Sequence, residues 1–214
     1  MEIKIRSITS QDTGFVAWTL LTASRSRRGI GFWDLLFPGA EEPRRRLVEQ
    51  FIRNLPPTFC HHRWFLIAEM GGRPAAALAG LDPRAAGPDL IKETLAALVA
   101  RESGSPGQIF AAARRLKPFL TCVPEIPTHH WCIESVATSA RYRRCGCARA
   151  LITASLNQGR RNGFNAAQLA VLLDNRSAIR LYESLGFTRL DEKRHPRFAA
   201  AIGAPGIARF VCGL

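Results

Sequence analysis

The chain has no long apolar run. A membrane-spanning helix needs ~20 consecutive apolar residues, and charged or polar side chains interrupt every candidate stretch. The run 14–23 could be mistaken for a signal peptide, yet Asp12 precedes it, and Phe15, Leu20 and Thr22 suit an amphipathic helix. The sequence therefore predicts neither a transmembrane segment nor a cleaved leader, and we expect a cytoplasmic protein.

Linkers, internal repeats and low-complexity segments are also lacking. Hydrophobic residues make up 47% and charged residues 22% of the 214 residues, a composition typical of a folded protein rather than of a disordered, collagen-like or coiled-coil chain. Since no Ser-rich or Pro-rich seam divides the sequence, we expect one domain over residues 1–214.

The six cysteines lack the close, paired spacings of a disulfide framework or a zinc ribbon. Cys145 and Cys147 stand near each other, but no further Cys or His cluster with zinc-ligand spacing accompanies them. We therefore expect reduced thiols, as in cytoplasm, and no metal site.

Acidic residues and lysines are scarce relative to arginines. The chain has 30 Lys and Arg against 17 Asp and Glu, a net charge of +13, and 4 of those 30 are lysines. Residues 128–198 hold 12 basic and 5 acidic side chains, a net +7. This charge predicts an anionic partner on the C-terminal third, for which a nucleic acid is one candidate.

Alternation and helical periodicity predict the order strand, two helices, two strands, inserted helices, and then strand, helix, strand, helix and two strands. The predicted strands are 2–8, 64–70, 75–81, 128–138, 167–173, 187–193 and 207–212. The predicted helices outside the insertion are 14–23, 44–55, 146–161 and 175–185. This pattern indicates an α/β sheet with helices on its faces.

The segment 82–127 departs from the strand pattern and predicts a helical insertion. Its first helical stretch is marked by Ile91, Leu95, Leu98 and Val99, and its second covers 108–120. Because amphipathic helices must bury their apolar faces, we expect them to pack on the domain, on a second subunit or over a substrate cleft. In a cleft wall, the side chains that meet an acidic group of that substrate would be Arg114, Arg115 and Lys117.

A strand, a basic turn and a helix start follow one another after residue 132. The strand reads Ile-Glu-Ser-Val-Ala-Thr from Ile133 to Thr138, and the turn reads Arg-Tyr-Arg-Arg-Cys-Gly-Cys-Ala from Arg141 to Ala148. Such a turn directs unpaired backbone N–H groups and the positive end of the helix dipole to one point, as a pyrophosphate requires. Gly146 and Ala148 keep the approach free of bulk.

A second motif, Asn-x2-Ala-x2-Leu-Tyr-x3-Gly-Phe, begins at Asn175, 32 residues after Arg143. Together the two motifs resemble the GNAT superfamily of acyl-CoA-dependent N-acyltransferases over about residues 128–190. The resemblance implies a mixed, mostly antiparallel sheet flanked by helices, with 82–127 inserted between the third and fourth strands. It also implies acetyl-CoA as the co-substrate.

The resemblance further implies a binding site for acetyl-CoA. The turn would hold the CoA pyrophosphate through Arg143, Arg144, Cys145, Gly146, Cys147 and Ala148. The pantetheine arm would be bound by Asn175 and by the strand residues Val136, Ala137 and Thr138. The turn departs from the family pattern at Arg144, where glycine is common, at the two cysteines, and at Ala148, which replaces a final glycine.

Acetyl transfer needs a neutral amine, stabilisation of an oxyanion and protonation of a thiolate. Tyr182 matches the family's tyrosine acid, and a phenol stays protonated at neutral pH; the alternative is a core tyrosine on an apolar helix face. Glu134 is the candidate base, and a surface glutamate paired with an arginine is the alternative. Since Glu134 stands two residues before Val136, we expect both on one strand face, with a backbone N–H near Val136 as the oxyanion donor.

We therefore expect direct transfer of an acetyl group from acetyl-CoA to a primary amine of a small molecule or a protein. The alternatives are a nucleic-acid-associated basic protein and a non-catalytic GNAT fold that binds acyl-CoA. We expect neither membrane nor nucleic acid as a partner and leave a homodimer open. The net charge favours an acidic or neutral acceptor over a cationic polyamine.

Overall fold

A seven-stranded sheet in the order β1-β2-β3-β4-β5-β7-β6 forms the centre of the molecule. The computed structural model describes residues 2–54, 59–86 and 106–214. The strands are β1 (Ile3–Ser7), β2 (Phe65–Met70), β3 (Arg73–Leu81), β4 (Trp131–Thr138), β5 (Ala166–Leu172), β6 (Thr188–Arg194) and β7 (Gly206–Gly213). The helices in these residues are α1 (Thr13–Ser24), α2 (Phe32–Leu36), α3 (Glu41–Asn54), α4 (Pro83–Ala86), α6 (Pro106–Leu120), α7 (Cys147–Arg161), α8 (Arg176–Glu183) and α9 (Pro196–Ile202).

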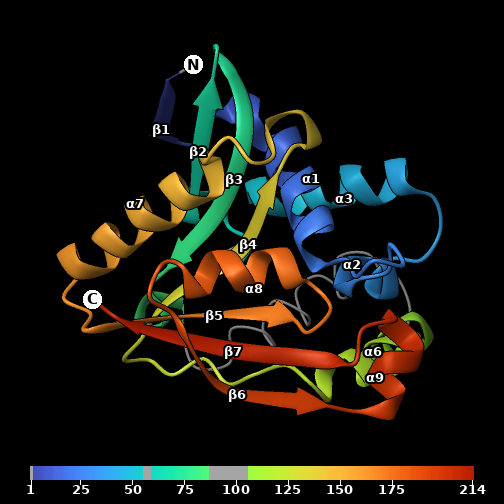
Figure 1. Ribbon diagram of the computed structural model, residues 1–214. Coiled ribbons are helices and arrows are strands. Elements are labelled where there is room, and N and C mark those ends of the chain that lie inside the picture. Colours follow the sequence, from blue (N-terminus) through green and yellow to red (C-terminus); the bar gives the residue numbers. More distant parts are fainter. Residues whose placement is uncertain (1, 55–58, 87–105) are drawn as a thin grey trace.

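Neighbouring strands run antiparallel except β4 and β5, which are parallel. The predicted mixed, mostly antiparallel sheet is therefore confirmed. β4 and β5 pair through three positions, from Trp131 opposite Ala167 to Ile133 opposite Leu169. Beyond Ile133 the two strands separate, and Figure 1 shows β5, β7 and β6 turned away from the direction of β2 and β3.

Helices cover both faces of this sheet. α7 and α8 lie on one face, and α1 and α3 lie on the other (Figure 1). The side chains of β2 show how one strand serves both: Leu66 and Ala68 enter the core on the α7 face, whereas Phe65 and Ile67 enter the core on the α1 face. Because successive strand residues point to opposite faces, a nearly continuous apolar strand is buried on both sides.

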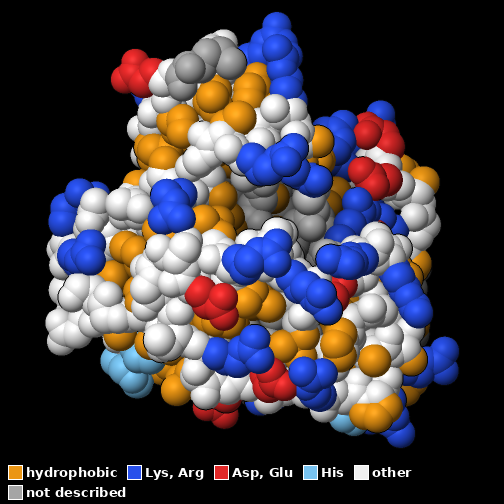
Figure 2. All heavy atoms as spheres, in the orientation of Figure 1, with side chains coloured by type: hydrophobic (Ala, Val, Ile, Leu, Met, Phe, Trp, Pro, Cys, Tyr) orange, Lys and Arg blue, Asp and Glu red, His pale blue; other side chains and the backbone are white. Residues whose placement is uncertain are grey.

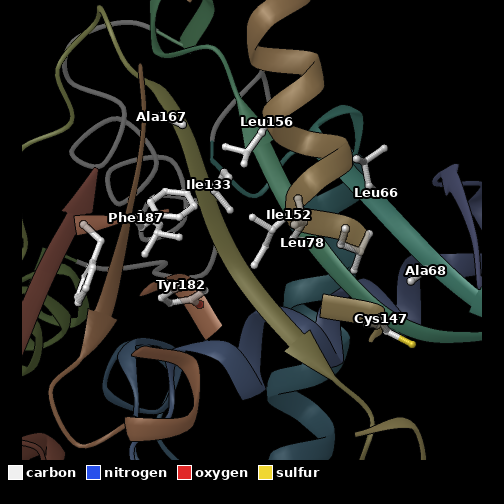
Figure 3. Packing of buried hydrophobic residues seen from close by; sticks show 14 of the residues in the cluster. Leu66, Ala68, Leu78, Ile133, Cys147, Ile152, Leu156, Ala167, Tyr182 and Phe187 are labelled. Atoms are coloured by element: carbon white, nitrogen blue, oxygen red, sulfur yellow. The ribbon is translucent and has the colours of Figure 1, made fainter. Parts of the chain in front are cut away.

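The helix α7 packs across the first half of the sheet. Ile152 and Leu156 point from it toward the strands that carry Leu78 and Ile133 (Figure 3). The helix begins after Gly146, which has a left-handed conformation with φ 87° that a glycine adopts without strain. The predicted helix 146–161 is thus confirmed, and its first turn follows the C-terminal end of β4.

The insertion between β3 and β4 contains α4 and α6. α6 confirms the helical stretch predicted over 108–120, and its residues Ala112 and Leu116 are buried in the core on the α1 face. The first predicted stretch, with Ile91, Leu95, Leu98 and Val99, lies outside the described residues.

Two short helices, α2 and α9, are absent from the sequence prediction. They span five and seven residues, two turns or fewer, which is too short to establish a period. Tertiary contacts hold α2 in place. The buried Arg44 guanidinium donates to the carbonyl oxygens of Phe37 and Gly39, both at 2.7 Å, and to the Asp34 carboxylate at 2.6 Å.

Within the described parts of the chain, no helix has the length and apolar character that crossing a membrane demands. Five of the six cysteines are buried, and Cys145 is exposed.

Candidate active site

β4 carries a bulge where it leaves β5. Its register with β3 advances by three residues on β4, from Ala137 to Glu134, but by two residues on β3. Ser135, inside the bulge, has a positive φ of 54°. Such a bulge interrupts the ladder and changes the direction of the side chains that follow it.

The bulge places Glu134 and Val136 on opposite faces of the sheet, so the prediction that they share a face is wrong. Glu134 lies opposite Ala79, which belongs to the core on the α1 face, whereas Val136 packs against the core on the α7 face. Alternation with a period of two holds in a regular strand, and the extra residue reverses it.

A cavity of about 180 Å³ lies where β4 and β5 separate. It is lined by Glu134, Ser135 and Val136 of β4, by Tyr182 of α8, and by residues of α1, α2 and α6. Figure 2 shows the surface hollowed near the C-terminal end of β4, with Lys and Arg side chains around the hollow. The cavity therefore contacts both faces of the sheet at the strand separation.

Glu134 lines this cavity and is half-buried. Burial raises the pKa of its carboxyl from 4.5 to about 7, and a hydrogen bond from the Cys132 thiol (Sγ to Oε1 3.6 Å) opposes that rise. No arginine is among the groups that shift this pKa. A carboxyl with a pKa near 7 is suited to accept a proton at neutral pH.

The Tyr182 side chain lines the cavity and also packs in the core on the α7 face. Its side chain is 6% exposed, and its ring centroid is 6.2 Å from that of Phe187 and 6.5 Å from that of Phe210. Burial, followed by the charge of Glu134, raises the pKa of the phenol above its usual range. The hydroxyl is therefore protonated at neutral pH, and the core position does not exclude a role as an acid.

The turn before α7 presents its backbone to solvent. Arg144 has a positive φ of 64° and Gly146 one of 87°, and both residues are exposed, as is Arg143. The first backbone hydrogen bond of the helix runs from Ala150 N–H to Gly146 O at 3.0 Å. The N–H groups that precede it have no acceptor within the helix, as the predicted anion site requires.

The two cysteines of this turn point in different directions. Cys145 is exposed, whereas the Cys147 side chain is 1% exposed and its thiol lies 3.2 Å from the Met70 sulfur. The side chain of Cys147 thus belongs to the core, and any contact with an anion falls to its backbone N–H. Among the described residues, no group of three or more His, Cys, Asp or Glu could hold a metal ion.

The strand residues predicted to bind pantetheine lie beyond the last pairing between β4 and β5. Val136 lines the cavity, Ala137 pairs with Ala77, and Thr138 pairs with Ala76 of β3. Because β3 occupies one edge of β4 and β5 has left the other, that second edge presents backbone donors and acceptors to a ligand.

Asn175 lines the cavity and caps α8. Its Oδ1 accepts from the Ala178 N–H at 3.3 Å and from the Ser177 hydroxyl at 3.1 Å. A side-chain cap of this kind fixes the start of the helix that carries Tyr182. The amide nitrogen of Asn175 is not used by the cap.

Sequence reasoning missed Phe32 and Trp33 of α2, which line the cavity on the α1 face. Phe119 of α6 lines it too, in keeping with the expectation that the insertion packs over a cleft. Arg115, expected to meet the acceptor, instead donates to the carbonyl oxygens of Leu35 (2.9 Å) and Leu36 at the end of α2. Arg114 and Lys117 are exposed and do not line the cavity. Helical periodicity can predict that aromatic residues lie on a buried helix face, but it does not predict a cavity between helices.

Comparison with known proteins agrees with this geometry. Residues 32–187 match the model of the acetyltransferase (GNAT) family. An N-acetyltransferase from Staphylococcus aureus Mu50 is similar in structure, with a TM-score of 0.66 and 17% identity over 99% of this chain and 100% of that one. A polyamine N-acetyltransferase from Drosophila melanogaster gives a TM-score of 0.55 and 14% identity over the full length of both chains.

The ribosomal-protein-S18-alanine N-acetyltransferase from Escherichia coli shares the fold as well, with a TM-score of 0.52 and 15% identity over 99% of this chain and 94% of that one. No curated protein sequence matches the chain. The family match extends over more than half of the chain and includes the bulged strand, the turn before α7 and Tyr182. The chain belongs to the GNAT family of acetyltransferases.

Proposed function

We propose that this protein transfers an acetyl group from acetyl-CoA directly to a primary amine in the cavity between β4 and β5. The proposal rests on two side chains that line one cavity. The Glu134 carboxyl has a pKa of about 7, and the buried Tyr182 phenol is protonated. A base and an acid held at one place are what amide formation from a thioester needs.

The residues around the strand separation suit the parts of acetyl-CoA. The exposed turn from Arg143 to Ala148 offers backbone N–H groups and positive charge to the pyrophosphate. The open edge of β4 at Val136, Ala137 and Thr138 offers backbone groups to the amides of the pantetheine arm, and Asn175 offers its amide nitrogen. The peptide N–H near Val136 is the donor proposed for the carbonyl oxygen as negative charge builds there.

Because of the bulge, the two proposed catalytic residues lie on different faces of the sheet, and each moves a different proton. Glu134, on the α1 face, accepts the proton that the amine loses as its nitrogen bonds to the carbonyl carbon. Tyr182, on the α7 face, donates its proton to the sulfur as the carbon–sulfur bond breaks. The Glu134 carboxyl then loses its proton to water, and the Tyr182 phenolate takes one from water. Each turnover therefore consumes one amine and one thioester and yields one amide and one thiol.

Binding of acetyl-CoA at the turn is tested by thermal stabilisation. Saturating acetyl-CoA should raise the melting temperature of the wild type by mass action, and Arg143→Glu should abolish that rise because it places a negative charge beside the phosphates. Arg161→Glu, at the other end of α7 and also exposed, is the matched control and should retain the rise. An equal rise in both variants removes the turn from the site.

A catalytically inactive acyl-CoA-binding protein is the remaining alternative within the family. It would show the same stabilisation but no amine-dependent release of the CoA thiol.

A further inference from the structure

The cavity extends from Glu134 to an aromatic wall on the α1 face. Phe32 is central to this wall: its ring centroid lies 5.1 Å from Trp33, 6.1 Å from Phe59 and 5.5 Å from Phe119, each in an edge-on arrangement. All four rings line the cavity. Glu134 belongs to the same face, because its partner Ala79 packs in the core that contains Phe32 and Trp33.

The charge of the cavity is confined to one place. Among its described lining residues, Glu134 is the charged one, and the side chains with hydroxyl or amide groups are Ser24, Ser135, Asn175 and Tyr182. The other lining residues are apolar. On the α1 side they come from α1, α6 and the segment after α6, namely Leu20, Ala23, Leu120, Val123, Pro124 and Ile126, and the rest come from β4, β5 and β7. A second ammonium group on an acceptor seated here would lose its hydration against apolar surface.

The wall is held in place before any ligand arrives. Arg44, 6% exposed, ties the end of α2 to α3 through three acceptors. Arg115 of α6 ties the same end through the carbonyl oxygens of Leu35 and Leu36. A preformed apolar wall lowers the cost of ordering the site on binding.

We propose that the acceptor is a small primary amine with an aromatic or branched alkyl body and no second charge, seated with its body on this aromatic wall and its nitrogen at Glu134. This inference rests on the proposed function. The nitrogen–carbon bond forms as the carbon–sulfur bond breaks; Glu134 takes the amine proton and Tyr182 supplies the thiol proton. A peptide is less suited to the wall, because helix backbones on that side satisfy their own hydrogen bonds and offer few partners to an extended chain.

The test compares amines at one acetyl-CoA concentration, with thiol release and product mass as readouts. We expect kcat/KM for 2-phenylethylamine to exceed that for putrescine, for spermidine and for a short peptide with a free N-terminus by at least ~10-fold, the range that burial of an apolar group provides. A preference for a polyamine or for the peptide overturns the inference.

A substitution in the cavity tests whether the amine binds there. Ala23→Phe fills the space beside the wall from α1 and should raise the KM for 2-phenylethylamine by about tenfold or more. Ala113→Phe, on the exposed side of α6, is the matched control and should leave that KM unchanged. Equal KM values in the two variants place the amine elsewhere and refute the inference.

Failure of the inference and failure of the proposed function give different results. Acetyl-CoA stabilisation with turnover of a polyamine or a peptide keeps the acetyltransferase and removes the aromatic acceptor. If acetyl-CoA stabilises the protein but no amine is bound or acetylated, both the proposed function and the aromatic acceptor are refuted. Both are also refuted if acetyl-CoA does not stabilise the protein.

Discussion

At the scale of single residues, Ser135 decides how the site is arranged. With its positive φ of 54° it adds one residue to β4 relative to β3. Glu134 consequently faces the α1 core while Val136 faces the α7 core, where Tyr182 also packs. In a regular strand Glu134 and Val136 would lie on the same face.

Tyr182 is tested by removing its hydroxyl. Tyr182→Phe should lower kcat by about 10²-fold, the scale for one acid, with little change in the KM for acetyl-CoA or in stability, because phenylalanine keeps the contacts with Phe187 and Phe210. Steady-state kinetics give both parameters. Tyr142→Phe, at the other tyrosine of the chain and outside the cavity, is the control. Wild-type kcat in Tyr182→Phe would return Tyr182 to a purely structural role.

The raised pKa of Glu134 makes a prediction about stability. The folded state binds this proton more tightly than the unfolded chain does, since the pKa is about 7 rather than 4.5. The resulting stabilisation is complete below pH 4.5 and is lost as the pH rises through about 7. Above that range, the buried charge destabilises the fold.

Glu134→Gln removes that charge and should therefore raise the free energy of unfolding at pH 8 by up to about 3 kcal/mol, with no gain at pH near 4. Urea denaturation at the two pH values measures the difference. Glu183→Gln, at an exposed position of α8, should show no such dependence. If Glu134→Gln gains nothing at pH 8, the carboxyl is not shielded from water.

At the scale of elements, the turn between β4 and α7 stores backbone strain. Arg144 occupies the left-handed region with φ 64°, where the crowding of a Cβ costs ~1–2 kcal/mol that glycine avoids. The family pattern favours glycine at this position, and the structure supplies the physical reason.

Arg144→Gly should stabilise the protein by about 0.5–1 kcal/mol, because relief of strain exceeds the added entropy of the unfolded chain. Arg143→Gly is the matched control: Arg143 has φ −65°, so glycine there should destabilise by up to ~1 kcal/mol. Thermal unfolding without ligand gives both values. A loss of stability in Arg144→Gly would contradict the strain.

Elements with a strong period were predictable from the sequence, and elements defined by tertiary contacts were not. The apolar run of β2 and the helical repeat of α7 located both within a few residues. α3 begins at Glu41, three residues before its predicted start, because the acidic residues and Pro43 that open the helix lack its apolar period. α2 is fixed by side chains outside it, namely Arg44 of the next helix and Arg115, which lies 80 residues from Leu35.

The candidate site divides in the same way. Its motif residues could be placed from the sequence, since a turn before a helix and a tyrosine on a helix are local features. The bulge at Ser135 and the aromatic wall depend on how β4 leaves β5 and how α2 meets α6. A hydrophobic pattern within one element does not predict how that element packs against another.

At the scale of the whole molecule, the two halves of the sheet separate at β4 and β5, and the cavity occupies that separation. Lys and Arg side chains lie around the hollow in Figure 2, where their charge would suit the phosphates of CoA, and the aromatic wall lies on the side where the acceptor is proposed. A charged co-substrate and an apolar acceptor can then approach one bond from different faces of the sheet.

The central claim is acetyl transfer with Glu134 as the base, and the most direct measurement is amine-dependent release of the CoA thiol from acetyl-CoA as a function of pH. The wild type should show a rate that rises with an inflection near the Glu134 pKa of about 7. Glu134→Gln should lose that inflection and about 10²-fold in rate at pH 8, with its stabilisation by acetyl-CoA unchanged. A variant that keeps the wild-type rate and inflection, or a wild type that binds acetyl-CoA and releases no thiol with any aryl, alkyl, polyamine or peptide amine, would contradict the account.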